Sequence, residues 1–582
     1  MKRPLLLVFF SFQLAICVAQ ISSSSILLSA TVLAAEEGQP LPYANIYNKR
    51  LQTGTATNLN GYFELPNNRI GDTVEVSYLG YISRQIVIAP QMPETIGLNR
   101  SNDLLGEVVV TAQDDYLYDL VGEARKNNKT IPKTSKTYFY LETFLLEEPV
   151  EIIEAYYNGT YLDYGIEDLK YKKGRIGLRP VNRRYFSSTE SSLLFSKHDV
   201  FSKSYLFPDN PLCLRKGALK RRYDLQLRNR FNDSGSKIYV VDFQPRRVED
   251  LFSGTLWIDQ SEKRIIKISL KISDSKKHPF TPIGYNTIQD VDMEITRSYT
   301  EIDQQLYLST IDFNYSVAYV DTLGTKQEAK TSAYSKAYDY NQTFNLPYFK
   351  FTKAFHKDYR NITVSDYDAL FWNKTTEFRF YDRLEETEQF IQENRLENNV
   401  IYSGRDTKQQ QLQWPYIRWT EERFKMSEAP VSKIEPPLYI SRYRTNWYNL
   451  DVKLFLDVNF LGDSMTFQLM AILDPIDTYY YFYLKNNDHA FMNMYFDLME
   501  IQQRQLRAEL LLLSHPTKEE LDQLYEKHVA EYDKKARTFV SETKRGANLN
   551  NMEKWNDYIY NHLQVDNLKL FSLEEVEVRK EK

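Results

Sequence analysis

The sequence predicts a multidomain, β-rich protein in which two β-domains precede a C-terminal α+β domain. Short alternating strand patterns broken by turns fill residues 26–112 and 136–345, while two long helical patterns follow the strand expected at 452–460. Aromatic residues make up 14% of the chain, with 44 Tyr and 32 Phe, and such side chains pack well on pleated sheets. A length of 582 residues is enough for three or four domains, each with its own core.

The first residues have the order of an export signal. Lys2 and Arg3 are positive, residues 5–16 are apolar, and a small-x-small site ends at Ala19. We therefore expect residues 1–19 to be a signal peptide and Gln20 to begin the mature chain. The alternative is a lipoprotein signal with Cys17 as the lipidated residue, although the bulky Ile16 before it fits that reading less well.

After the signal, no run of about eighteen apolar residues is present, so we expect no membrane-spanning helix. The mature chain keeps one cysteine, Cys213, which excludes an internal disulfide or a cysteine-based metal site. The net charge of -5 gives no indication of a nucleic-acid partner.

Residues 26–112 predict a small β-sandwich of about seven short strands. Asn60-Gly61 is a strong hairpin signal, because both residues tolerate positive φ. Val74, Val76 and Tyr78 then alternate with polar neighbours, as in a half-buried strand. The runs QIVIA and GEVVVTA complete the set.

This segment resembles the carboxypeptidase-like regulatory domain along its whole length. The resemblance lies in PLPYANIYNKRLQTGTATNLNGYFEL, GDTVEVSYLGY and LGEVVVTA. It implies a prealbumin-like fold and a place at the N-terminus of exported proteins of bacteroidete-type bacteria, including outer-membrane nutrient receptors. The family's domain has no catalytic residues, so a carboxypeptidase label would come from the domain name alone.

The central region predicts a curved antiparallel β-sheet. A short amphipathic helix at 115–130 precedes it, and RIIKISLKI is expected to turn Ile266, Ile268, Leu270 and Ile272 to one face. The runs at 237–245 and 251–268 resemble strand pairs of the half-open barrels of outer-membrane lipoprotein carriers. The basic run at 214–230 is expected to be one exposed strand face.

The rest of the chain predicts a connecting region and an α+β domain. A helix is expected at 376–396, a proline-containing linker at 428–439 and a strand at 452–460. Two long helices should follow, the second opening with Thr517 and Glu520 as a capping box. The expected division is 1–19 signal, 26–112 sandwich, 113–135 linker helix, 136–345 half-barrel-like domain, 346–440 connecting region and 441–582 α+β domain.

No motif for chemistry is evident. The 7 His residues are scattered singly, with no pair at i,i+4, and GxSxG, GxxxxGK[ST] and GxGxxG are absent. We therefore assign no catalytic, cofactor-binding or metal-binding residue and expect no cofactor.

Residues 491–507 resemble the helix HExxHFDxxExxxRxLR of a family of predicted bacterial zinc proteases, and 542–555 resemble its ETxHGxNxxxQxxW stretch. The ligand and base positions hold Phe491, Met492, Tyr495 and Arg545, so the resemblance implies a protease fold that has lost its zinc. The surrounding positions are kept as Phe496, Asp497, Glu500, Arg504, Leu506 and Arg507. The alternative is an ordinary buried helix with an apolar stripe through Phe491, Tyr495 and Leu498.

Together these observations predict a non-catalytic exported protein that acts as a binding or scaffold module in the periplasm or at the outer membrane and cell surface. Its expected partners are envelope proteins or a glycan or peptide ligand, with possible peripheral contact with the outer membrane. The alternative is an envelope hydrolase, for peptide or glycan, with an unrecognised site. An outer-membrane barrel is disfavoured, because the chain ends in helical patterns rather than in a strand.

Overall fold

The computed structural model describes residues 26–573, with internal gaps of which the longest are 102–113, 350–360, 375–383, 396–415 and 422–447. The described part of the chain is β-rich, with 44% of its residues in strands and 25% in helices. It divides into two compact units, one formed mainly by the residues up to Val109 and the other by most of the chain after them. None of the described helices is long and apolar enough to span a membrane. The expected signal peptide and the run GEVVVTA lie outside the described residues.

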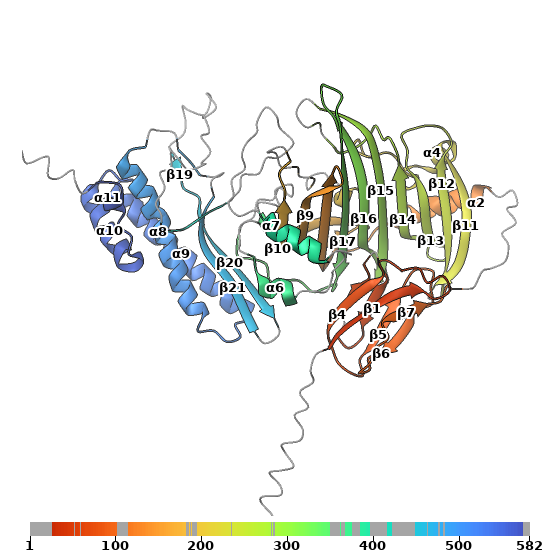
Figure 1. Ribbon diagram of the computed structural model, residues 1–582, viewed down its shortest axis with the longest axis horizontal. Coiled ribbons are helices and arrows are strands. Elements are labelled where there is room, and N and C mark those ends of the chain that lie inside the picture. Colours follow the sequence, from red (N-terminus) through yellow and green to blue (C-terminus); the bar gives the residue numbers. More distant parts are fainter. Residues whose placement is uncertain are drawn as a thin grey trace, which may run out of the picture. The chain divides into compact units, whose positions relative to one another are not determined.

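The first unit contains a two-sheet β-sandwich (Figure 1). One sheet has the order β4-β1-β7 and the other has the order β3-β2-β5-β6. The strands are β1 (Ile26–Ala34), β2 (Asn45–Asn48), β3 (Thr53–Ala56), β4 (Tyr62–Asn68), β5 (Thr73–Ser77), β6 (Arg84–Val87) and β7 (Thr95–Leu98). Alternation in β5 buries Val74 and Val76, as the sequence predicts.

The expected hairpin at Asn60-Gly61 is wrong in one respect. The turn forms, with Gly61 at φ 74° and with the Asn58 side chain accepting hydrogen bonds from Asn60 N and Tyr62 N. However, β3 and β4 belong to different sheets, so this turn carries the chain across the sandwich. Local sequence determines such a turn, whereas pairing depends on which strands bury their apolar faces together.

In the second unit, one sheet of ten strands has the order β10-β9-β8-β17-β16-β15-β14-β13-β12-β11 (Figure 1). The registers of its described pairs are antiparallel. Its strands are β8 (Lys133–Leu145), β9 (Glu148–Leu162), β10 (Gly165–Leu178), β11 (Tyr223–Asp233), β12 (Ser236–Pro245), β13 (Ser253–Asp259), β14 (Arg264–Ile272), β15 (Thr287–Ile302), β16 (Gln305–Val320) and β17 (Lys326–Tyr338). The predicted linker helix is α2 (Asp114–Ala124).

One local prediction in this region is confirmed and one is wrong. Ile266, Ile268, Leu270 and Ile272 of β14 all contact the same apolar cluster, as expected, and a β-bulge that pairs Trp257 with Lys267 but Ile258 with Ile265 adds the fully buried Ile265 to it. The basic run is not a single strand face: it begins as helix α4 (Lys216–Arg222) and only then continues as β11. Straight-chain basic residues favour a helix as readily as an exposed strand.

The described C-terminal part combines a small sheet, β18-β21-β20, with helices that include the long α8, α9 and α10. Leu454, Leu456 and Val458 of β20 pack against α8, while Phe455 on the other face packs with Tyr416 and Ile472. The elements are α6 (Ala369–Lys374), α7 (Leu384–Glu393), β18 (Ile417–Arg418), β19 (Tyr448–Asn449), β20 (Val452–Leu461), β21 (Ser464–Leu473), β22 (Tyr479–Tyr480), α8 (Asn486–Leu510), α9 (Lys518–Thr543), α10 (Leu549–Leu563) and α11 (Asn567–Leu570).

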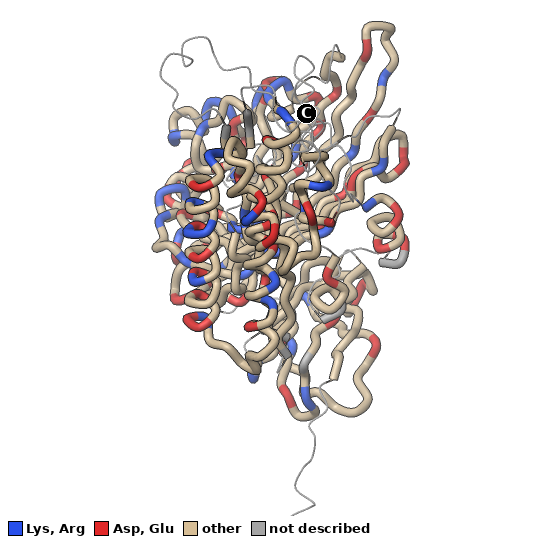
Figure 2. The backbone as a smooth tube through the Cα atoms, turned by 90° about the vertical axis from the view of Figure 1, so that its left-hand side faces the viewer, with Lys and Arg blue, Asp and Glu red and all other residues tan. Residues whose placement is uncertain are grey.

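The predicted capping box is confirmed. Thr517 accepts a hydrogen bond from Glu520 N at 3.2 Å, and the Glu520 carboxylate accepts one from Thr517 N at 2.7 Å. Two long helices are too few, because α10 is a third with 15 residues. Only α7 of the helix expected at 376–396 lies within the described residues, and the linker at 428–439 lies outside them. Figure 2 shows Lys and Arg interspersed with Asp and Glu along the C-terminal helices.

A buried ion cluster joins the edge strand β10 to β20. Asp457 accepts from Lys172 at 2.5 Å and pairs with Lys173 at 2.7 Å, and Lys173 also reaches Asp368 at 2.9 Å. Successive residues of a regular strand point to opposite faces. The register pairs Tyr171 with Tyr157 and Lys173 with Tyr156, so Lys172 is the bulge residue. The bulge therefore allows two adjacent lysines to share one carboxylate.

Candidate binding face of the ten-stranded sheet

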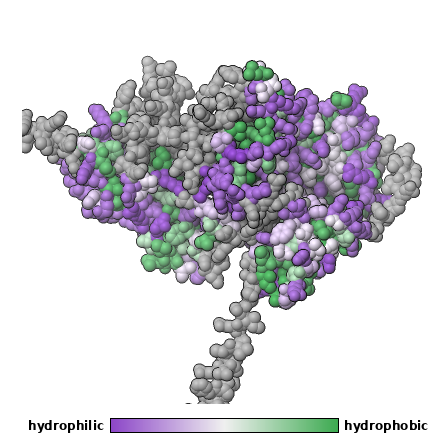
Figure 3. All heavy atoms as spheres, in the orientation of Figure 1, coloured by the Kyte–Doolittle hydropathy of each residue, from purple (hydrophilic) through white to green (hydrophobic). Residues whose placement is uncertain are grey.

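The candidate site is the inner face of the ten-stranded sheet, defined here as the face that carries Phe139, Ile153, Ile268, Ile295 and Phe313. These side chains are at most 3% exposed and belong to the largest apolar cluster of the described chain. The inner face is buried inside the protein. The surface that Figure 3 shows is instead mostly hydrophilic, with separate apolar areas. Such a face in a curved sheet suits an apolar ligand when nothing else occupies it.

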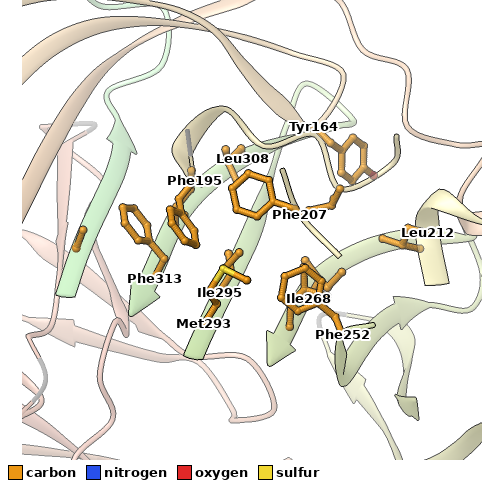
Figure 4. Packing of buried hydrophobic residues seen from close by; sticks show 14 of the residues in the cluster. Tyr164, Phe195, Phe207, Leu212, Phe252, Ile268, Met293, Ile295, Leu308 and Phe313 are labelled. Carbon is orange, nitrogen blue, oxygen red and sulfur yellow. The ribbon is translucent and has the colours of Figure 1, made fainter. Parts of the chain in front are cut away.

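Residues 195–222, called the covering segment here, occupy this face. Phe195 stacks on Phe313 and on Tyr315, each with ring centroids 5.1 Å apart, and Phe207 meets Phe195 edge-on at 5.1 Å (Figure 4). The segment continues through a short turn of helix, η1 (Pro211–Cys213), into α4, which packs on α2. The sheet therefore buries its apolar side chains against a peripheral stretch of its own chain.

One cation lies inside this apolar face. Val291, Met293, Ile295, Arg297 and Tyr299 alternate along β15, and all five are buried. Arg297 is 1% exposed, and its Nη2 donates to Phe195 O at 2.9 Å and to Ser196 O at 3.3 Å. No carboxylate of the described residues lies within ion-pair distance of Arg297, and its Nε has no acceptor. Arg297 is not among the residues expected from the sequence, although strict alternation from Val291 to Tyr299 pointed to its burial.

A second buried charge lies four strands away in sheet order. Glu151 of β9 is fully buried and accepts hydrogen bonds from Ser188 N at 2.7 Å, Ser188 Oγ at 2.6 Å and Thr143 Oγ1 at 3.2 Å. Thr143 also contacts Thr331 of β17 at 3.0 Å. Unlike Arg297, this carboxylate is well supplied with hydrogen bonds, so it fixes the adjoining strands and the residue Ser188.

A separate hollow of about 430 Å³ lies where α7 meets β10. Arg175 and Arg395 contribute cations and Glu388 contributes a carboxylate, while Tyr367 stacks under the Arg395 guanidinium at 5.4 Å. Arg175 is itself held by Glu154 at 2.6 Å and by the ring of Trp372 at 4.4 Å. Mixed charges that already pair within the protein leave this hollow with little selectivity for a ligand.

The zinc-protease-like positions lie together, but they form an aromatic stack. Phe491 stacks on Phe539 with centroids 5.0 Å apart, and Tyr495 meets Tyr532 edge-on at 5.8 Å. The second family-like stretch does reach this helix, because Asn487 donates to Gly546 O at 3.0 Å. Among the described residues, no group of three His, Cys, Asp or Glu side chains is placed to hold a metal ion.

The polar residues of α8 that fit the zinc-protease pattern have structural contacts. Asp497 accepts from Trp419 Nε1 at 2.7 Å and from Asn567 Nδ2 at 2.7 Å, which ties α8 to β18 and α11. Glu500 pairs with Arg504 at 3.0 Å, and burial raises the pKa of Glu500. The histidines of this region are also packed: His528 lies 3.2 Å from both Gln502 and Glu509.

Comparison with known proteins identifies the N-terminal domain. Residues 28–110 match the CarboxypepD_reg-like domain family, which confirms the carboxypeptidase-like regulatory domain expected from the sequence. The TonB-dependent receptor SusC of Bacteroides thetaiotaomicron is 33% identical over 93 residues, and the match covers 16% of this chain but only 8% of the receptor. The match therefore spans only a small part of that receptor's length.

Among solved structures, two give partial matches. A DUF1329 family protein from Desulfovibrio piger covers 40% of this chain and 95% of its own, with 11% identity and a TM-score of 0.17. A LolA superfamily protein from Nitrosomonas europaea covers 39% and 94%, with 13% identity and a TM-score of 0.15. At these TM-scores the fold of the sheet rests on its own register and topology.

Proposed function

We propose that this chain is a non-catalytic, exported cell-envelope protein in which the inner face of the ten-stranded sheet is a binding module for an apolar ligand. The observation that carries the proposal is the pairing of this face with the covering segment. A continuous apolar surface is covered by residues 195–222 through aromatic contacts and two hydrogen bonds from Arg297. Exchange of that segment for a ligand would keep the face buried.

The location is part of the same proposal. The charge and apolarity of residues 1–19 support export with cleavage after Ala19. The regulatory-like domain at 28–110 and its similarity to one part of a TonB-dependent receptor support a place in the cell envelope. Envelope proteins are the expected partners of the sandwich, and the mixed surface charges do not favour nucleic acid.

The C-terminal helices are proposed to be structural. The positions that resemble zinc ligands hold Phe491 and Tyr495 in a buried aromatic stack, and Met492 is 2% exposed with no group that could act as a base. Descent from a zinc protease that lost its metal is consistent with these residues, as is an ordinary packed helix. Neither origin supplies a hydrolytic site, so no observation favours the hydrolase alternative.

A neutral naphthylamine probe tests the binding proposal by its fluorescence. We expect saturable binding to the full mature chain and tighter binding to Phe195→Ala. Phe195 makes two stacked aromatic contacts with the sheet, each worth about 1 kcal/mol beyond burial. Losing about 2 kcal/mol of covering-segment contact should raise the apparent affinity by about 10- to 30-fold.

Phe571→Ala is the matched control, because Phe571 is 6% exposed and stacks on His489 in the C-terminal helices. It removes a similar side chain without touching the inner face, so its probe affinity should equal that of the wild type. Absence of saturable binding in both the wild type and Phe195→Ala would refute the binding module. Equal tightening by both variants would instead indicate non-specific exposure of apolar surface.

A further inference from the structure

The turns at one end of the ten-stranded sheet carry exposed apolar side chains. Neighbouring strands between β8 and β13 in the sheet are antiparallel, so the turns after β8 and β16 and the loop before β13 lie at the same end, the upper end in Figure 1. These three connections are called the rim here: residues 146–147, 321–325 and 246–252. Leu146 is 64% exposed, Leu323 is 91% exposed and Val248 is fully exposed. Figure 3 shows separate apolar spots along this upper edge.

The strand turns at the opposite end of the same sheet are different. They are Asp163–Tyr164, residues 260–263 and Asp303–Gln304, and Tyr164 is the one large side chain among them that is buried. Their first left-handed position holds Asp163 or Asp303, whereas the rim holds Leu146 there at φ 51°. A left-handed backbone favours Asp, Asn or Gly, so neither backbone nor solvent selects a leucine. Exposed apolar residues are therefore a property of the rim rather than of strand turns in general.

The turn around Leu323 holds this side chain away from the sheet. The Asp321 carboxylate accepts hydrogen bonds from Leu323 N and Thr325 N, each at 2.8 Å, and Gly324 takes φ 84°. These bonds fix the turn, so the leucine remains in water instead of folding onto the strands. Its transfer into an apolar environment would lower the free energy without any rearrangement of the turn.

Two arginines without a carboxylate partner lie beside Val248. The backbone bond from Arg246 N to Arg222 O, 2.8 Å long, brings their neighbours Arg247 and Arg221 to one place, called the arginine corner here. Arg222 and Arg246 pair with carboxylates at distances up to 3.1 Å. Arg221 and Arg247 are exposed, and no carboxylate of the described residues lies within ion-pair distance of either one. The arginine corner therefore has two cations available to an outside anion.

The carboxylates of the rim are already held by donors of the protein. Glu147 pairs with Lys330 at 2.9 Å, and Asp250 and Asp321 accept hydrogen bonds from backbone N–H groups. These groups give the rim no large net charge. Attraction for an anion is therefore confined to the arginine corner, while the other turns offer apolar contact.

The spacing of the apolar tips decides what can cover them. β8 and β13 are five strand positions apart in the sheet, which is about 24 Å. Separate tips at that distance form no groove for a small ligand. A lipid surface meets all of them, because apolar tips enter its acyl region while arginines contact its phosphate groups.

We propose that the rim docks the protein on the surface of a phospholipid bilayer. Leu146, Val248 and Leu323 enter the bilayer between the head groups, and the arginine corner contacts lipid phosphate. The docking goes beyond the proposed function, since it uses the end of the sheet and needs no ligand on the inner face.

Flotation of the full mature chain, without attached lipid, with vesicles tests the docking. We expect binding to phosphatidylcholine vesicles, and binding about 10- to 30-fold tighter when phosphatidylglycerol is added, because each basic residue near an anionic surface adds attraction. Leu323→Ser should weaken binding to both kinds of vesicle by about tenfold, because less apolar surface leaves water. Arg221→Gln combined with Arg247→Gln should remove only the preference for phosphatidylglycerol.

Leu512→Ser is the matched control, because Leu512 is 85% exposed but lies in the α8–α9 loop. It should bind vesicles like the wild type, and every variant should keep the wild-type melting temperature. A wild type that binds neither kind of vesicle would overturn the docking, as would equal weakening by Leu323→Ser and Leu512→Ser. Binding that Leu323→Ser leaves intact would show adsorption by charge alone and would also overturn it. Naphthylamine binding should be unchanged in Leu323→Ser, so failure of the docking is distinguishable from failure of the proposed function.

Discussion

Asp457→Asn tests the buried ion cluster, because it removes one charge and keeps the shape of the side chain. Asp457 is fully buried, and Lys172 and Lys173 are 2% and 3% exposed at the side chain. After the substitution, Lys173 still has Asp368 at 2.9 Å, whereas Lys172 keeps only neutral acceptors, Asn345 O at 2.7 Å among them. The variant therefore leaves one buried ammonium without a counter-charge.

The magnitude follows from that uncompensated charge. Removing one partner of a buried ion pair costs about 3–5 kcal/mol. Lys172 can limit the cost by releasing its proton, and burial already lowers its pKa. Neutralising a lysine at pH 7, about 3.4 pH units below its ordinary pKa, costs about 5 kcal/mol, which is the upper limit. We expect Asp457→Asn to lower the free energy of unfolding by about 3–5 kcal/mol.

Hydrogen exchange measured by mass spectrometry reports this loss of stability near the cluster. The backbone amides of β10 and β20 should exchange faster than in the wild type. The double variant Lys172→Met with Asp457→Asn should recover most of the protection, because it removes both charges. Glu294→Gln is the control: its partner Lys271 lies 3.5 Å away and is 65% exposed at the side chain, so the change should cost at most about 1 kcal/mol. Two results would refute this reasoning. One is that the amides of Asp457→Asn are protected to within about 1 kcal/mol of the wild type. The other is that the double variant is no better protected than the single variant.

The same cluster predicts the direction of a pH effect. Attraction to Lys172 and Lys173 outweighs burial and lowers the pKa of Asp457 below its ordinary value. A carboxyl with a lowered folded-state pKa stabilises the fold fully above its ordinary pKa, near ~3.9, and that stabilisation is lost as the pH falls through the lowered value. Asp457→Asn should therefore lose less protection than the wild type as the pH falls below about 4.

Three further predictions concern other parts of the chain. Protein dialysed against zinc should carry well under one equivalent by elemental analysis; stoichiometric zinc would contradict the packed aromatic positions of α8. N-terminal sequencing of protein from cells should begin at Gln20, whereas a lipid-modified Cys17 would show that the lipoprotein signal is the right one. Asp72→Asn should lower the melting temperature of the sandwich, because Asp72 accepts from Arg50 at 2.5 and 2.7 Å and from Asn48 at 3.0 Å; an unchanged melting temperature would contradict this.

Local patterns predicted most of the elements correctly. Alternation located β5 and β20, and the Thr517–Glu520 spacing located the start of α9, because each pattern depends on residues close in sequence. The regulatory-like domain could be recognised for the same reason, since its resemblance lies in one continuous segment. Errors occurred where distant strands decide the pairing, as at the turn of Gly61, and where helix and strand are both open to the sequence, as at α4.

The candidate site could not be found in this way. Its parts come from the β9–β10 turn, from β15 and from the covering segment, so Tyr164, Arg297 and Phe195 are far apart in the chain. Arg297 does follow the alternation of β15, but a charged residue at a buried position is normally assumed to break the pattern. Only the packed structure shows that Arg297 is buried with backbone carbonyls as acceptors.

The sequence by itself determined the β-rich class, the regulatory-like domain and the lack of zinc-binding atoms at Phe491 and Tyr495. Composition, turn chemistry and the donor atoms of a side chain are properties of single residues and short segments. The tertiary structure decided which strands share a sheet, that a bulge brings Lys172 and Lys173 to one carboxylate, and that residues 195–222 cover the inner face. These features depend on burial and pairing between distant segments, since the free energy of an apolar face or a buried charge is set by what packs against it.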